Sequence, residues 1–291
     1  MSERIFKESL IEDFGRLGIQ RGDVVLIRAA LGSIGKISGG AGAFIDALLE
    51  TVGAEGTIVS LAFTEATFLR KPKIEDAFNI KKKSYAGALP NAMLARNDAF
   101  RSRHPMCSYV AIGRYAEQIT SDHNENSPAY EPIRKILELN GKNVLIGCVS
   151  SSPGFTTTHL AEADLGMLKR LPIFSGFSSV FYEKESGGYA IFRRYDSGLC
   201  SNSFYKFYAL YVKEGILSAG FVGAAYSVLV PARKSYDIEF NKLKEDEKFN
   251  ICDSKYCFTC NANRWDRINH LPGFFFRLAY KKLMAQRISK K

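Results

Sequence analysis

The chain has 291 residues, of which 46% are hydrophobic and 24% charged, and its formal net charge is +10. This composition is typical of a globular protein that is long enough to bury a sizeable core. No apolar stretch reaches transmembrane length, and the charged start MSERIFKESLIEDFGRLG does not fit a signal peptide. We therefore expect a cytoplasmic protein that does not enter a membrane, with thiols rather than a disulfide framework.

The positive charge favours anionic partners, either nucleic acid or phosphorylated small molecules. The basic residues are dispersed, apart from the short segments KPKIEDAFNIKKK and AYKKLMAQRISKK. Neither segment has the aromatic interleaving of a nucleic-acid-binding motif. We expect small-molecule partners and no nucleic acid.

The first third of the chain alternates between helical and strand-like patterns. Residues 5–18 have the apolar spacing of an amphipathic helix, and 22–31 form a nearly continuous apolar run of the kind found in buried strands. A glycine-rich loop over 32–42 then precedes a helix over 43–53 that ends at a glycine, and 56–64 are the next buried strand. This strand–helix–strand order predicts a largely parallel sheet.

The later segments continue the α/β pattern with added β elements. We expect surface loops over 64–88, helices over 89–98, 130–142 and 203–217, strands over 109–113, 143–149 and 220–233, and a hairpin over 180–195 that turns at Ser-Gly-Gly. No repeat or clear linker interrupts the chain. The prediction is one α/β domain spanning 1–291, with inserted β elements and a basic, cysteine-containing C-terminal extension from about residue 245.

Two loops have residues suited to binding an anion. LGSIGKISGGAG lies between a strand and a helix, where free N–H groups and the helix dipole favour phosphate, although it is neither a Walker A nor a dinucleotide-binding motif. In RSRHPMCS, Arg101, Arg103 and His104 precede or flank a proline. The alternative to anion binding is an ordinary tight turn for the glycine-rich segment and a solvated loop for RSRHPMCS. His123, in SDHNENSPAY, has the same two interpretations.

The segment FTTTHLAEAD carries the third candidate. If a helix begins near Thr157 or Thr158, then His159 and Glu162 lie three residues apart on one face. A carboxylate beside an imidazole stabilises its cation and its tautomer, as a general base requires. On spacing alone, the pattern favours a surface His–Glu pair on a capped helix.

The cysteines near the C-terminus form the fourth candidate. Cys252, Cys257 and Cys260, followed by His270, supply four possible zinc ligands, but the spacing is irregular and contains one CxxC. Thiols need no metal partner in a cytoplasmic protein. We therefore expect no metal and keep this set as the alternative.

Together these segments resemble the aminoglycoside 3-N-acetyltransferase family of acetyl-CoA-dependent enzymes. The similar pieces, which cover about the first four-fifths of the chain, are residues 22–64, 100–123, 126–148, 156–162 and 220–233. The resemblance implies that family's α/β fold, a central mostly parallel sheet flanked by helices, and transfer of an acetyl group to a sugar amine in a ternary complex. It also implies that His159 is the general base and that Glu162 orients it.

The resemblance further implies that acetyl-CoA is the co-substrate. Its binding residues would be Ser33, Gly35, Gly39, Gly40, Arg101, Ser102, His104, Thr156 and Thr157. The N–H groups or hydroxyls around 156–158 would also stabilise the oxyanion.

The acceptor is predicted from charge. Enzymes that bind polycationic aminoglycosides line their sites with carboxylates, whereas this chain is basic and offers Arg193 and Arg194 in FRRY. Arginine suits a diphosphate, so we expect a nucleotide-linked amino sugar, such as a dTDP-linked amino-dideoxyhexose for lipopolysaccharide O-antigen synthesis. His123, Arg193 and Arg194 would then contact the substrate, and a homodimer is compatible with the family.

Three alternatives remain open at this point. The first is an aminoglycoside 3-N-acetyltransferase that confers antibiotic resistance. The second is a basic, non-catalytic binding protein of the same fold, against which the intact His159 and Glu162 argue. The third is a zinc-dependent hydrolase that uses the late cysteines.

Overall fold

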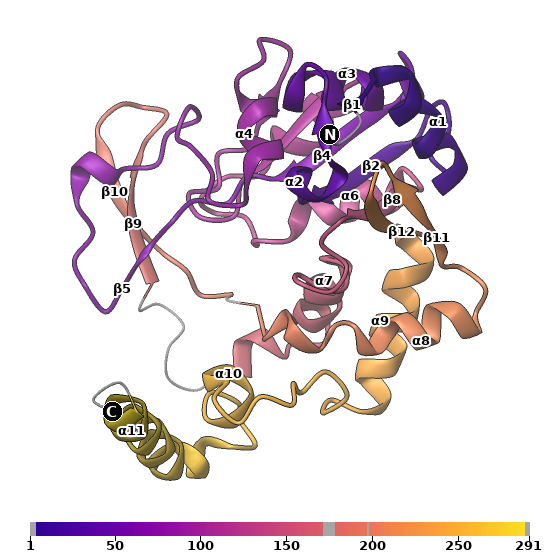
Figure 1. Ribbon diagram of the computed structural model, residues 1–291. Coiled ribbons are helices and arrows are strands. Elements are labelled where there is room, and N and C mark those ends of the chain that lie inside the picture. The colour runs from indigo at the N-terminus through magenta and orange to yellow at the C-terminus, as the bar shows by residue number, and fades with distance from the viewer. Residues whose placement is uncertain (1–3, 171–177, 197, 289–291) are drawn as a thin grey trace.

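A seven-stranded sheet forms the centre of the molecule (Figure 1). The computed structural model describes residues 4–170, 178–196 and 198–288. The sheet has the strand order β11-β12-β8-β2-β4-β7-β6. Its strands are β2 (Val24–Ala29), β4 (Thr57–Leu61), β6 (Phe100–Arg101), β7 (Tyr109–Gly113), β8 (Lys142–Ile146), β11 (Ser218–Val222) and β12 (Ala225–Pro231). The predicted α/β fold is confirmed.

The parallel strands lie at the centre of the sheet. β2 pairs in parallel with β4 on one side and with β8 on the other, as the predicted strand–helix–strand unit requires. The outer pairs are antiparallel. The segment 220–233, expected as one strand, is a hairpin of β11 and β12, because Gly223 turns the chain with a φ of 56°.

Each face of the sheet is covered by helices. Successive residues of β2 alternate between the faces: Val24 and Leu26 belong to one buried cluster, and Val25 and Ile27 to the other. Helices α1 (Lys7–Leu17), α3 (Gly40–Val52) and α4 (Ala88–Leu94) cover the second cluster. Helices α5 (Ala116–Thr120), α6 (Glu131–Glu138), α7 (Thr157–Asp164), α8 (Lys206–Lys213) and α9 (Ala232–Glu245) pack against the first.

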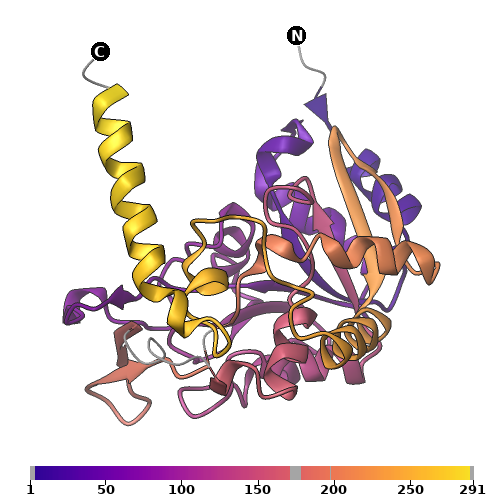
Figure 2. The same ribbon diagram turned by 90° about the horizontal axis from the view of Figure 1, so that it is seen from below.

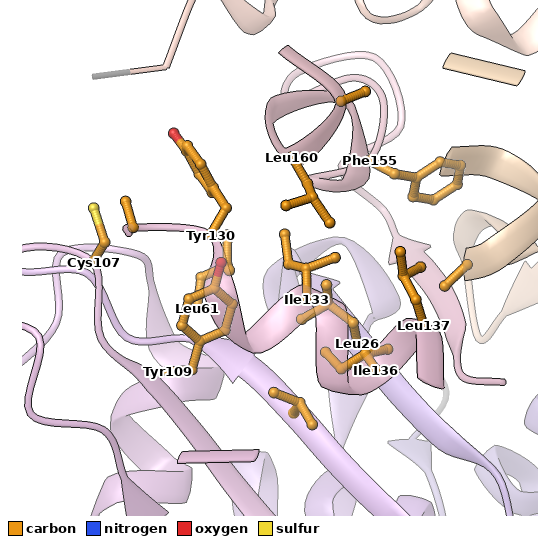
Figure 3. Close-up of a cluster of buried hydrophobic side chains, with 14 of the residues drawn as sticks. Leu26, Leu61, Cys107, Tyr109, Tyr130, Ile133, Ile136, Leu137, Phe155 and Leu160 are labelled. Atoms are coloured by element: carbon orange, nitrogen blue, oxygen red, sulfur yellow. The ribbon is translucent and has the colours of Figure 1, made fainter. Parts of the chain in front are cut away.

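Figure 3 shows how the first cluster connects the sheet to the helix that carries the candidate base. Leu26 of β2 lies beside Ile133 and Ile136 of α6, and Leu160 of α7 points toward the same group. All four side chains are at most 4% exposed. Burial of a leucine or isoleucine contributes about 2 kcal/mol, so these contacts hold α7 firmly against the carboxyl ends of the strands.

A small second sheet extends from the loops at one side of the molecule (Figure 1). It consists of β5 (Thr67–Phe68), β9 (Ser178–Glu183) and β10 (Tyr189–Arg193), and the predicted hairpin is confirmed. Residues 64–88, expected as surface loops, contain β5 and the 3-10 turn η1 (Ile74–Asp76). The glycine-rich loop contains the helical turn α2 (Leu31–Ile34) and the strand β3 (Lys36–Ile37), which pairs with β1 (Arg4–Ile5).

The C-terminal segment packs beside the region of α7 and α8 and then leaves the body of the molecule. It contains α10 (Phe258–Asn261), the turn η4 (Ile268–His270) and α11 (Leu271–Ile288), and two further 3-10 turns, η2 (Leu168–Arg170) and η3 (Ser201–Ser203), lie earlier in the chain. Figure 2 shows α11 extending away from the sheet and its helices. Among the described residues, no helix has both the length and the apolar character needed to cross a membrane.

Candidate active site

The structure brings His159 and Glu162 together on α7. His159 Nδ1 lies 2.8 Å from Glu162 Oε2, one helical turn away. The spacing predicted this contact, because residues three apart share a helix face. The helix itself begins after the loop 147–156 that follows β8, so the pair lies beyond the carboxyl edge of the parallel strands.

The Glu162 carboxylate is fully buried and is held by three donors. Besides His159, it accepts a hydrogen bond from the Leu199 N–H at 3.3 Å and another from the side-chain amide of Asn250. A buried carboxylate needs such partners to compensate for the water that it loses. Two distant segments therefore fix the carboxylate in one orientation, and the carboxylate in turn fixes the imidazole.

The His159 ring is packed on both sides but remains reachable from one end. Tyr130 stacks on it with ring centroids 5.0 Å apart, and Phe204 contacts it edge-on at 4.8 Å. Its side chain is 16% exposed, and its Nε2 forms no hydrogen bond with any residue that the structure describes. Because the Nδ1–H donates its hydrogen bond to the Glu162 carboxylate, Nε2 has a lone pair that can accept a proton from a bound substrate.

A cavity lies at the carboxyl ends of three neighbouring strands, β4, β2 and β8. We call it the strand-edge cavity; it measures about 320 Å³ and is lined by Arg28, Ala29, Ala30, Leu31, Gly32, Ser60, Leu61, Ala86, Gly87, Ala88, Pro90, Cys148 and Ser152. β2 leads to α3 on one face of the sheet, and β8 leads to α7 on the other. Parallel strands whose connections diverge in this way open a crevice that commonly binds ligands.

Arg28 is a site residue that the sequence reasoning missed. It donates hydrogen bonds to the Ser152 hydroxyl and carbonyl, both at 3.0 Å, and to the Gly154 carbonyl. Burial lowers its pKa, and no carboxylate pairs with it in the part of the chain that the structure describes. It thus ties the loop before α7 to β2 and presents a cation to the strand-edge cavity. The signal was an arginine inside the apolar run VVLIRAA.

A second cavity of about 400 Å³ lies beside the first. We call it the loop cavity; it is lined by Thr64, Glu65, Ala66, Tyr85, Met106, Ser178 and Arg194. Arg194 connects it to the base, because its guanidinium donates to the Tyr130 hydroxyl at 2.9 Å and Tyr130 stacks on His159. Arg194 also pairs with Asp196, with Nε and Oδ1 3.5 Å apart. The charge of Arg194 is therefore already offset, while its neighbour Arg193 is exposed on β10.

The residues predicted to bind the coenzyme in the glycine-rich loop divide into two groups. Ser33 directly follows Leu31 and Gly32, which line the strand-edge cavity, and its hydroxyl donates to the Ala30 carbonyl at 2.7 Å. Gly35, Gly39 and Gly40 are not among the lining residues. Their φ angles of 114°, 84° and 62° show that they shape the turns into β3 and α3.

Arg101 performs a structural task in this fold. Its guanidinium donates to the backbone carbonyls of Ala62 at 2.8 Å, Ile80 at 3.1 Å and Lys82, and it lies 5.0 Å from the centre of the Phe78 ring. Burial lowers its pKa to about 10. Arg101 therefore ties the 64–88 segment to the sheet instead of facing either cavity.

Ser102, His104 and His123 form a buried cluster behind the loop cavity. The two imidazoles stack 4.8 Å apart, and His123 bonds Ser102 Oγ and the Pro128 carbonyl at 2.9 and 3.1 Å. His104 Nδ1 accepts backbone N–H groups at 3.2 and 3.0 Å. Burial lowers the pKa of His104 well below its usual value and that of His123 to about 3. All three side chains are at most 2% exposed, and none of them lines either cavity.

Thr156 and Thr157 begin the helix that carries His159. Thr156 is the N-cap residue of α7, and its side chain makes no capping hydrogen bond. The Thr157 hydroxyl donates at 3.0 Å to Glu239, a fully buried carboxyl whose pKa burial raises to about 8. Tyr211 donates to the same carboxyl. Thr157 thus anchors α7 to α9 and is not available to a ligand through its hydroxyl.

The late cysteines come together with a partner that the sequence reasoning missed. Cys252, Cys257 and Cys260 share one cluster with Cys200, and their sulfur atoms all lie within 4.8 Å of one another. His270, the fourth ligand in the predicted set, is exposed and is not part of this group. Because Cys200 lies 52 residues before Cys252, no local spacing could reveal it.

The chain belongs to the aminoglycoside 3-N-acetyltransferase family, whose sequence profile matches residues 26–244. It is 30% identical to an aminoglycoside N(3)-acetyltransferase IX of Micromonospora chalcea, over 55% of this chain and 62% of that protein. It is 29% identical to an aminoglycoside N(3)-acetyltransferase III of Salmonella sp, over 54% of this chain and 60% of that protein. The matched part thus spans about three-fifths of the length of these relatives.

Solved structures agree with this assignment. AAC-IIIb in a binary complex with CoASH superimposes with a TM-score of 0.69 at 26% identity, covering 84% of this chain and 97% of that one. The aminoglycoside acetyltransferase AAC(3)-Xa gives a TM-score of 0.72 at 27% identity, covering 83% and 93%. The resemblance stated from the sequence is confirmed at the level of family and fold.

Proposed function

We propose that this chain transfers the acetyl group of acetyl-CoA to an amine of an aminoglycoside, with His159 as general base and Glu162 as the residue that orients it. The observation that carries the proposal is the 2.8 Å hydrogen bond between His159 Nδ1 and the buried Glu162, within a chain of the aminoglycoside 3-N-acetyltransferase family. The relatives are named as aminoglycoside N(3)-acetyltransferases, and one of the similar structures holds CoASH.

The two residues have distinct tasks in this mechanism. A neutral amine is the nucleophile, and its nitrogen must lose a proton as it becomes an amide. His159 Nε2 accepts this proton, because Nδ1 is engaged with Glu162. The negative charge of Glu162 then stabilises the imidazolium, and its two other donors prevent the carboxylate from following the ring.

Acetyl-CoA, as the second substrate, supplies an acetyl thioester. The strand-edge cavity suits one end of such a molecule, since it combines an apolar floor with the cation of Arg28. Its wall includes Cys148 and Ser152, which lie in the loop that leads into α7 and His159. The Thr157 hydroxyl is bonded to Glu239, and the N–H groups of Thr158 and His159 donate to the carbonyls of residues 155 and 156. The N–H groups of Thr156 and Thr157 are therefore the backbone candidates for the oxyanion role.

The choice of acceptor rests on the loop cavity and on the relatives. The Arg194 charge is offset by Asp196, and Glu65 presents a further carboxylate to the same cavity. This lining suits a cationic amino sugar better than a diphosphate. The nucleotide-linked acceptor expected from the net charge of the chain has no support among the named relatives, which are aminoglycoside acetyltransferases.

An acceptor screen tests the proposal. The purified chain is incubated with acetyl-CoA and one of two sets of acceptors, and release of the coenzyme thiol is followed. The first set is sisomicin, apramycin and gentamicin, which are aminoglycosides bound in structures of similar fold. The second set is nucleotide-linked amino sugars. We expect turnover with an aminoglycoside. Turnover confined to the nucleotide-linked sugars would overturn the aminoglycoside as acceptor. If no coenzyme thiol is released with either set of acceptors, acetyl transfer to these amines is overturned.

A further inference from the structure

Four cysteines from two segments converge beside the base. Cys200 precedes the turn η3, Cys252 follows α9, Cys257 caps α10 and Cys260 lies within it. All four are free thiols, and their sulfur atoms lie within 4.8 Å of one another. Cys252 and Cys260 are buried, at 8% and 3% exposed, and the other two are half-buried. The family profile ends at residue 244, before three of the four.

This geometry matches the requirements of a single tetrahedral ion. Zinc bound by four thiolates at about 2.3 Å holds their sulfurs about 3.8 Å apart, so only small side-chain adjustments separate the cluster from a closed site. Thiolates are soft ligands that select zinc over calcium or magnesium. A structural zinc site has four protein ligands and no open position, and four cysteines satisfy this condition without water or histidine.

The surroundings are suited to the negative charge of such a site. The backbone N–H of Cys252 points at Cys260 Sγ at 3.4 Å, which is a hydrogen bond that stabilises a thiolate. Lys206 donates to the Ile251 carbonyl at 2.6 Å and Arg267 to the Cys260 carbonyl at 3.3 Å. A zinc ion with four thiolates carries a net charge of about −2, and Arg267 offsets part of it, while Lys206 is shared with Asp253, whose Oδ1 lies 3.7 Å from its Nζ.

We propose that Cys200, Cys252, Cys257 and Cys260 bind one structural Zn²⁺ ion. Binding replaces four S–H protons by four zinc–sulfur bonds and releases these protons to solvent, with no change in oxidation state. The ion connects the segment after β10 with the segment after α9. These segments are 52 residues apart in sequence, and the ion would add to the hydrogen bonds that already join them, such as those from Ser203 to the Asn250 carbonyl and from Tyr205 to Asp253.

The same two segments hold Glu162. The Leu199 N–H, next to Cys200, and the Asn250 side chain, two residues before Cys252, are its donors. The zinc ion would thus fix the position of the carboxylate that orients His159, so the cysteines are positioning residues and not catalytic ones. This consequence rests on the proposed acetyl transfer; the metal site itself does not.

The direct test is the metal content of the wild-type chain, purified without a polyhistidine tag or chelator. We expect elemental mass spectrometry to find one zinc per chain. The zinc should be lost in Cys257→Ser. It should be retained in the control variant Cys107→Ala, whose thiol lies in the core away from the cluster. Replacement of zinc by Co²⁺ should give the intense thiolate charge-transfer absorption of a tetrahedral site. A metal-free wild-type chain that takes up no zinc when it is added, a disulfide between two of the four cysteines, or bound iron would overturn the proposal.

A second measurement separates this site from the proposed function. Zinc is removed from the wild-type chain by a chelator and then restored, and kcat and KM are recorded at each stage. We expect kcat to fall at least about 10-fold and to recover with zinc, while KM for acetyl-CoA changes less. A full kcat without zinc would overturn the positioning role. A chain that holds zinc but acetylates no acceptor would leave the metal site in place and overturn the proposed function.

Discussion

The molecule contains two histidine centres that differ in two respects. His159 has a buried carboxylate at its Nδ1 and an accessible Nε2, whereas His104 and His123 stack on each other in the core without a carboxylate. Burial without a counter-charge disfavours the imidazolium, and it lowers the pKa of His123 to about 3. The comparison shows that a buried carboxylate partner and one free nitrogen make an imidazole suitable as a base, while burial alone makes it a neutral core residue.

Removal of the base should have the largest effect. We expect His159→Ala to lower kcat about 1,000-fold, because a positioned general base typically contributes factors of this order. Binding of acetyl-CoA, measured by calorimetry, should change little. His270→Ala is the matched control, since His270 is exposed and lies outside both centres. Turnover in the His159 variant within threefold of wild type would contradict the assignment.

The core pair should control stability in acid. The pKa of His123 is lower in the folded chain than the value of about 6.5 in an unfolded one, so the unfolded chain binds the proton more strongly. The contribution of His123 to the free energy of unfolding is complete above pH 6.5 and is lost as the pH falls toward 3. By pH 4.5 the loss is about 3 kcal/mol. Urea unfolding at pH 7 and 4.5 measures this loss. His123→Gln should lose less between the two pH values, and an unchanged loss would exclude His123 as its source.

The partner of the base should have an intermediate effect. Glu162→Gln retains the shape of the side chain but removes the charge that stabilises the imidazolium, and we expect kcat to fall about 10- to 100-fold. Steady-state kinetics with acetyl-CoA and an aminoglycoside measure this fall. Asp164→Asn, on the same helix, is the control. A kcat within threefold of wild type in the Gln variant would contradict the role of Glu162.

A second buried carboxyl should have the smallest effect, and on stability alone. Burial raises the pKa of Glu239 to about 8. The contribution of this carboxyl to the free energy of unfolding is therefore present at low pH and is lost as the pH rises through 8. Between pH 7 and 9 the loss is about 1.4 kcal/mol. Thermal unfolding should show a flatter alkaline limb in Glu239→Gln than in the wild type. Equal limbs would show that Glu239 is already ionised at pH 7.

Local patterns were sufficient where a site lies within one element. His159 and Glu162 share a helix, so their contact followed from a spacing of three residues and was expected before the fold was known. The apolar run of β2 likewise predicted a buried central strand. Patterns were insufficient where a residue is used by distant partners. Arg101 and His123 read as anion-binding loop residues, but the fold buries His123, half-buries Arg101 and bonds both to other segments.

By itself, the sequence determined the α/β class, the elements around the parallel strands and the pair on α7, because these depend on periodicity and on spacings of a few residues. It determined the family through the resemblance of several segments in their order along the chain. Only the tertiary structure decided that Arg28 faces the strand-edge cavity, that Arg194 is paired with Asp196, and that Cys200 joins the three late cysteines. These outcomes depend on contacts between residues that are far apart along the chain, or on which side of a turn a side chain falls. Burial and the distance between charges then set their chemistry, and both are properties of the packed molecule.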